Sequence, residues 1–152
     1  MFLGTYHVSM DDKGRVSMPA RFREVLSSNY SPELIITHLD NYLVAYPREE
    51  WLKLATSFDS AQAFDPKGHA YLRLFFARAT QCTLDSQGRT VIVPHLRELA
   101  ALQRELILVG IMNRIELWSQ ERWEAFVAEH RDQYAEQAGN LMRRSGLRGV
   151  SL

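Results

Sequence analysis

Two aspartate–arginine pairs are the residues of this sequence whose types and spacing could do chemistry. Asp11 stands four residues before Arg15, and Asp85 stands at the same spacing before Arg89. A carboxylate can hold a guanidinium group in one orientation, and an oriented guanidinium matches the paired acceptors of a phosphate or of a guanine edge. The simpler interpretation is a surface salt bridge that only closes a turn. The residues alone leave both interpretations open.

Further cations accompany the first pair more than the second. Lys13, Arg15, Arg21 and Arg23 stand in a run from 13 to 23 that contains no acid, whereas Gln87 occupies the position that corresponds to Lys13. We therefore expect the first copy to present the stronger cationic surface. A two-stranded ribbon that carries such groups can enter the major groove of DNA.

Catalytic and metal chemistry find little support in the sequence. The five histidines are scattered, and no two of them have the spacing of zinc ligands. No nucleophile motif or phosphate-cradling glycine loop is present. Cys82 falls within an expected strand, where a small buried hydrophobe is the usual role. We expect no enzyme activity, no metal and no cofactor.

The chain carries an internal repeat. MDDKGRVSMPARFRE at 10–24 aligns with LDSQGRTVIVPHLRE at 84–98, an offset of 74 residues. A later block, ELIITHLDNYLVAYPREEW at 33–51, aligns with ELILVGIMNRIELWSQERW at 105–123, an offset of 72 residues. Two matched blocks in the same order indicate a tandem duplication.

Each copy is expected to form strand, turn, strand, helix, hairpin and helix. Alternating apolar residues predict strands on both sides of each aspartate–arginine turn, and Gly14 and Gly88 suit a backbone with positive φ. A half of this size has too little core to stand alone, so we expect interleaved hairpins related by an internal pseudo-two-fold. The expected divisions are a first repeat at 1–56, a linking region with a largely buried helix at 57–77, a second repeat at 78–138, and a flexible basic tail at 139–152. The second repeat closes with a C-terminal helix that is expected to end near Gly139.

The overall composition limits the kind of partner and the compartment. The 152 residues are 46% hydrophobic and carry no net charge, which argues against coating nucleic acid by bulk electrostatics but allows a local basic surface. A single cysteine fits a reducing compartment. No leader pattern and no apolar run of about 18 residues is present, so we expect a cytoplasmic protein without a membrane partner.

The segment MFLGTYHVSMDDKGRVSMPARFRE, together with LDSQGRTVIVPHLRE and the ELILVG, ELWS and W block, resembles the MraZ family over nearly the whole chain. The resemblance implies an α+β fold of tandem duplicated AbrB-like swapped-hairpin β-barrel halves with flanking helices. It implies a nucleoid-associated transcriptional regulator of the division and cell-wall gene cluster. Such a regulator assembles as a homo-oligomeric ring and binds short G-rich direct repeats of double-stranded DNA.

The resemblance also implies roles for individual residues. By position, Lys13 and Arg15 are the leading DNA contacts, and Arg21 or Arg23 contacts phosphates. Asp11 and Asp85 would hold their turns through their own arginines. Because Gln87 departs from the cationic pattern, Arg89 could serve assembly instead of DNA contact. The alternative function is an antitoxin-like or adaptor module on the same fold, whose cationic turns dock an acidic protein.

Overall fold

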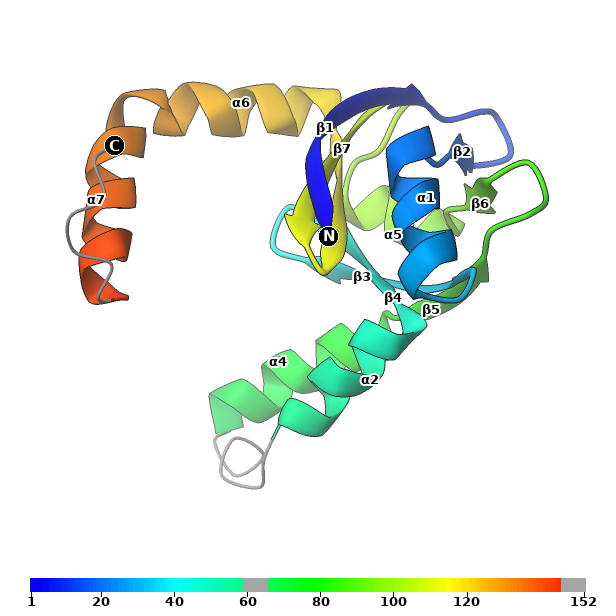
Figure 1. The fold of residues 1–152 in the computed structure, drawn as a ribbon, viewed down its shortest axis with the longest axis horizontal. Coiled ribbons are helices and arrows are strands. Elements are labelled where there is room, and N and C mark those ends of the chain that lie inside the picture. The colour runs from blue at the N-terminus through cyan, green and yellow to red at the C-terminus, as the bar shows by residue number, and fades with distance from the viewer. Residues whose placement is uncertain (59–65, 146–152) are drawn as a thin grey trace. The chain divides into compact units, whose positions relative to one another are not determined.

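The fold is taken from a computed structural model that describes residues 1–58 and 66–145. The chain forms two compact units, Met1–Gln120 and Glu121–Leu152. The first unit contains both repeats except for the final helix of the second one (Figure 1). The second unit contains the C-terminal helices.

The two repeats produce the same elements in the same order. The first repeat comprises β1 (Phe2–Ser9), β2 (Arg15–Ser17), α1 (Ala20–Asn29), β3 (Glu33–Leu39), β4 (Tyr42–Pro47) and α2 (Arg48–Ser57). The linking helix is α4 (Pro66–Ala77). The second repeat comprises β5 (Thr80–Thr83), β6 (Arg89–Val91), α5 (Pro94–Leu99), β7 (Glu105–Met112), β8 (Arg114–Ser119) and α6 (Gln120–His130).

The sheets are built by exchange of strands between the repeats. The larger sheet has the antiparallel order β1-β7-β8-β4-β3-β5, and the smaller sheet pairs β2 with β6. The first strand of each repeat therefore pairs with the third strand of the other repeat. If each strand is replaced by its equivalent in the other repeat, the order of strands in the larger sheet is the same read backwards. Neither half can satisfy its backbone hydrogen bonds without the other.

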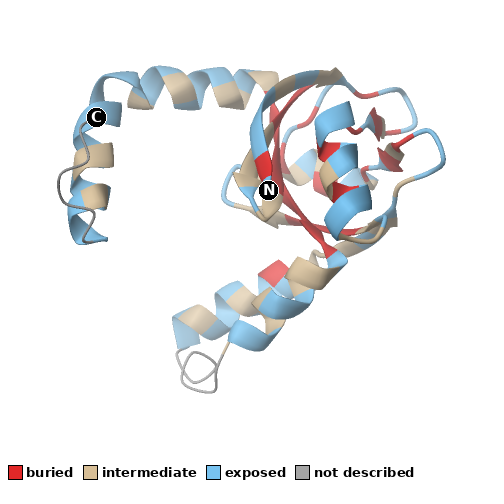
Figure 2. Ribbon diagram, viewed as in Figure 1, coloured by how far each residue is buried: buried red, intermediate tan, exposed pale blue. Residues whose placement is uncertain are grey.

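The hydrophobic core lies between the larger sheet and the helices α1 and α5. Alternation along the strands buries Val16 and Thr90, the central residues of β2 and β6. Phe22 of α1 packs edge-on against Phe2 of β1, with ring centroids 5.5 Å apart. Buried residues of both repeats form one hydrophobic cluster (Figure 2). Each fully buried side chain of this size contributes about 1.5–3 kcal/mol to the stability of the fold.

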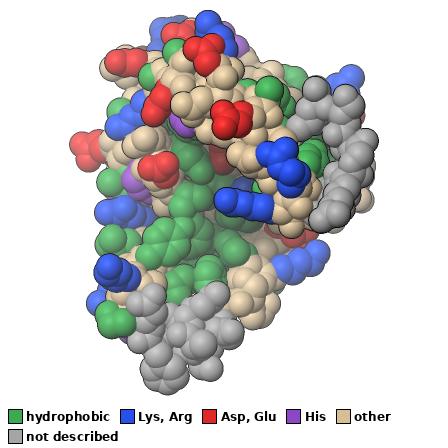
Figure 3. Space-filling model, turned by 90° about the vertical axis from the view of Figure 1, so that its left-hand side faces the viewer, with side chains coloured by type: hydrophobic (Ala, Val, Ile, Leu, Met, Phe, Trp, Pro, Cys, Tyr) green, Lys and Arg blue, Asp and Glu red, His purple; other side chains and the backbone are tan. Residues whose placement is uncertain are grey.

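The linking helix is less buried than its sequence predicts. Trp51 of α2 stacks on Phe75 of α4 at 5.4 Å, and Phe75 is the helix's one buried residue. Tyr71 and Leu74 are about half exposed, so the prediction of a largely buried helix was wrong. Among the described residues, the helix packs against α2 and β3. Figure 3 shows hydrophobic side chains gathered in the lower part of the view, at the height of α2 and α4 in Figure 1.

The second unit extends further as a helix than the sequence predicts. After α6, a 3₁₀ turn (Arg131–Gln133) leads into α7 (Tyr134–Arg144), so the predicted end of the helix near Gly139 was wrong. Arg143 and Arg144 occupy the last turn of α7, where cations favour the helix dipole and offset the cost of an internal glycine. Residues 146–152 of the expected basic tail lie outside the described residues. Within the described ranges, no helix is long and apolar enough to cross a bilayer.

Candidate nucleic-acid interface

The first aspartate–arginine pair forms a closed turn. One carboxylate oxygen of Asp11 accepts hydrogen bonds from the backbone N–H groups of Lys13 and Arg15, each at 2.9 Å. Gly14 follows with a φ of +80°, and its N–H donates to the Asp11 carbonyl at 3.0 Å. Glycine suits this left-handed position because a Cβ would be strained there. The sequence prediction of a glycine-dependent turn at this place is confirmed.

The same carboxylate orients the arginine side chain. The second oxygen of Asp11 accepts from Nε of Arg15 at 2.6 Å. The backbone hydrogen bond from Arg15, followed by its side-chain hydrogen bond, lowers the pKa of Asp11 below its ordinary value. The carboxylate therefore stays ionised near neutral pH and occupies one edge of the guanidinium. Among the described residues, the terminal nitrogens of Arg15 have no hydrogen-bond partner.

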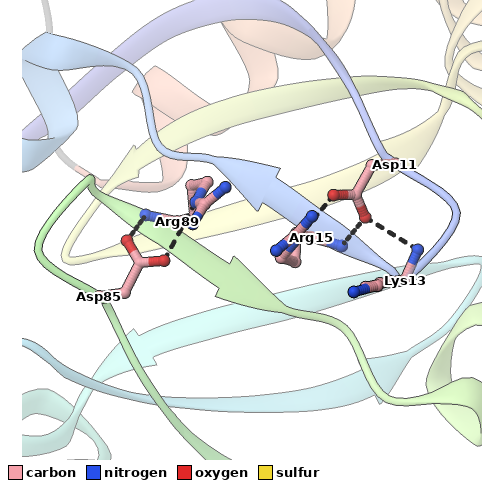
Figure 4. A network of polar contacts seen from close by, with 5 residues as sticks. All are labelled: Asp11, Lys13, Arg15, Asp85 and Arg89. Carbon is pink, nitrogen blue, oxygen red and sulfur yellow. Dashed lines mark hydrogen bonds and ion pairs between the residues drawn. The ribbon is translucent and has the colours of Figure 1, made fainter.

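The second pair repeats this geometry. Asp85 accepts from the N–H groups of Gln87 and Arg89, each at 2.9 Å, and from Nε of Arg89 at 3.0 Å. The backbone hydrogen bond from Arg89 is the largest cause that lowers the pKa of Asp85. Gly88 has a φ of +76°. Figure 4 shows the two pairs flanking the paired strands β2 and β6. Both predicted aspartate–arginine ion pairs are present.

Each turn is supported by the opposite repeat. The carbonyl of Gly14 accepts from the N–H of Ile92 at 2.8 Å, and the carbonyl of Gly88 accepts from the N–H of Met18 at the same distance. The guanidinium of Arg97 lies over Gly14, with Cζ 3.0 Å from where a Cβ would stand.

Arg23 takes the equivalent place over the second turn, with a terminal nitrogen 3.0 Å from a Cβ on Gly88. The sequence analysis did not predict that Arg97 contacts the turn of the other repeat. The signal that could have found it is the match of Arg23 with Arg97 across the repeat.

The structure separates the predicted cations into different settings. Lys13 lies exposed at the tip of the first turn, and Arg15 lies partly exposed at its end. Arg21 is exposed on α1, whereas Arg23 lies across the second turn. Arg15 and Arg89 lie on the same β2–β6 ribbon, where Arg15 stands opposite Val91 and Arg89 opposite Ser17. Within the described residues, no group of three or more metal-ligating side chains is assembled.

Together, the duplicated α+β fold and the two locked arginine turns define a class of two-repeat proteins that present basic turns on a shared scaffold. A family profile described as "MraZ protein, putative antitoxin-like" matches residues 1–74 and again residues 75–145. The chain belongs to the MraZ family.

Curated relatives match most of the chain. A "Transcriptional regulator MraZ" from Moorella thermoacetica is 42% identical over 134 residues, which cover 88% of this chain and 92% of the relative. One of the same name from Halothermothrix orenii is 40% identical and covers 93% of this chain and 96% of the relative. A solution structure of PHS018 from Pyrococcus horikoshii is 12% identical, with a TM-score of 0.34 over 77% of this chain and 88% of that one, and supports no inference.

Proposed function

We propose that the chain is a sequence-specific, DNA-binding transcriptional regulator. The observation that carries the proposal is Arg15, whose Nε is occupied by Asp11 while its terminal nitrogens have no partner among the described residues. A guanidinium held in this way offers two parallel donors, which match the O6 and N7 acceptors of guanine or two phosphate oxygens. The relatives named as transcriptional regulators support this reading.

The fold supports a specific scaffold for this contact. We assign it as two AbrB-like swapped-hairpin halves in one chain, because each repeat gives its first strand to the third strand of the other. The turn that carries Lys13 is also held by Ile92 of the second repeat, whose N–H donates to the carbonyl of Gly14. Such backing fixes the arginine before DNA arrives, which lowers the ordering cost of binding.

The neutral net charge fits an assembled regulator better than a single subunit. One protomer with a few cations binds DNA weakly, and a homo-oligomeric ring presents the first turn many times. Direct repeats in double-stranded promoter DNA then engage several subunits, and effective concentration raises avidity by about 10²–10⁴. The target is the DNA upstream of the division and cell-wall gene cluster, and the protein acts in the cytoplasm on the nucleoid.

The test is an anisotropy titration with a duplex taken from upstream of the chain's own gene. Arg15→Ala is expected to weaken specific binding at least about 100-fold, because each subunit loses a bidentate contact and several subunits act together. The variant keeps Asp11 and its hydrogen bonds to the backbone, so the turn is expected to persist. Size-exclusion chromatography of the variant checks that its oligomeric state is unchanged. Retained affinity of Arg15→Ala, or a protein partner recovered without any specific DNA, would favour the antitoxin-like or adaptor function.

A further inference from the structure

The β2–β6 ribbon has one outward face to which both repeats contribute. In the antiparallel register, Arg15 stands opposite Val91, and Ser17 stands opposite Arg89. Directly opposed residues share a face, and so do residues two apart along one strand. The central pair, Val16 and Thr90, is buried on the other face. The four flanking side chains therefore lie on one side of the ribbon.

Val91 is the apolar member of this outward face. Val91 is 46% exposed, although valine is usually buried in a hydrophobic core. Its neighbours on the face are Arg15 directly across and Arg89 two residues before it on the same strand. The repeat-equivalent position in β2 is Ser17. The ribbon thus presents two guanidinium groups with a methyl-bearing side chain between them on one strand and a hydroxyl on the other.

This pattern is complementary to a particular feature of the major groove. Arginine matches the guanine edge, and apolar side chains contact the 5-methyl group of thymine. Opposed side chains on a ribbon have Cβ atoms about 4.5–5.5 Å apart, and successive base pairs are about 3.4 Å apart. The lateral spacing of a valine and an arginine across the ribbon is thus comparable with the spacing of adjacent base pairs.

We infer that Val91 is a specificity-determining residue that contacts the 5-methyl group of a thymine beside the guanine bound by Arg15. The inference rests on the proposed function, since it requires the ribbon to face the major groove. It gives the second repeat a direct part in base recognition, although its turn carries Gln87 in place of Lys13.

The experiment uses two versions of the duplex from upstream of the chain's own gene, amplified with either thymidine or deoxyuridine triphosphate. Deoxyuridine pairs like thymidine and lacks only the 5-methyl group. The full-length protein is expected to bind the deoxyuridine duplex about fourfold more weakly per engaged subunit, which is the effect of losing one buried methyl contact. Val91→Ser, which copies Ser17 of the first repeat, is expected to bind both duplexes with equal affinity. Val91→Ile keeps an apolar side chain and is expected to retain the preference for thymidine.

Comparing ratios between the two duplexes separates the methyl contact from general effects of the base change on DNA shape. An equal thymidine preference in the wild type and in Val91→Ser would overturn the inference, as would a wild type that does not distinguish the duplexes. Either result leaves the proposed function intact if Arg15→Ala still weakens specific binding at least about 100-fold. A wild type that binds neither duplex specifically overturns the proposed function and this inference together.

Discussion

The turns at 11–15 and 85–89 have nearly the same backbone and different exposed side chains. Both contain an aspartate that accepts two backbone N–H groups at 2.9 Å, a glycine of positive φ and a paired arginine. They differ at the tip, where Lys13 corresponds to Gln87, and in the strand that follows, where Ser17 corresponds to Val91.

The residues that are the same in both turns are those that the fold requires, and the residues that differ are those that a binding partner could select. The aspartate and glycine satisfy local backbone demands that are the same in both repeats. The tip residues and the outward strand residues make no such contribution, so they can differ without loss of the fold. We therefore expect substitutions in the first group to change stability and those in the second to change binding.

The largest difference in stability is expected at the two glycines. A Cβ at Gly14 would stand 2.8 Å from the backbone oxygen of Ile92, a residue whose N–H donates to the Gly14 carbonyl, so relief of the clash would disturb that hydrogen bond. At Gly88 the nearest atoms belong to the side chain of Arg23, which can swing into solvent. Gly14→Ala should cost about 2–4 kcal/mol and Gly88→Ala about 1–2 kcal/mol, the latter mainly from the left-handed backbone. Urea unfolding measures both, and equal costs would contradict the asymmetry.

A smaller difference is expected when the tip residues are exchanged between the turns. Gln87→Lys adds a cation to the second turn, and Lys13→Gln removes one from the first. If both turns approach DNA, the slope of log K against log salt should steepen by about 0.9 per engaged subunit in the first variant and flatten by a similar amount in the second. A slope that responds only to Lys13→Gln would show that the second tip stays away from the phosphates. The double exchange serves as a matched control, since it keeps the net charge.

The local parts of this site could be predicted from the sequence, because their determinants lie within five residues. The four-residue spacing of Asp11 and Arg15 and the intervening glycine define the turn without help from the rest of the chain. The repeat itself also follows from comparing the two blocks. The prediction that such halves interleave followed from core size, and the structure pairs β1 with β7 and β3 with β5.

The parts that depend on distant segments could not be predicted. Arg97 contacts Gly14 only because β2 pairs with β6, a register that no local pattern specifies. The exposure of Tyr71 and Leu74 was missed for a related reason, since an apolar composition does not say which faces of a helix are covered. The helix through Gly139 was missed because glycine was read as an end, whereas the cations of the last turn favour continuation.

The smallest expected effect concerns the two carboxylates at low pH. Hydrogen bonding lowers the pKa of both Asp11 and Asp85 below 3.8. Each carboxylate therefore stabilises the folded state when the pH is above the pKa of the unfolded chain, and this stabilisation is lost as the pH falls through the pKa of the folded protein. The side-chain hydrogen bond from arginine is the second cause at Asp11, at 2.6 Å, and a lesser cause at Asp85, at 3.0 Å. Arg15→Ala should therefore raise the pKa of Asp11 more than Arg89→Ala raises that of Asp85. Carboxyl carbon NMR titration of the two variants measures the shifts. Equal shifts would contradict the difference between the turns, and no shift in either variant would mean that backbone N–H groups alone hold both turns.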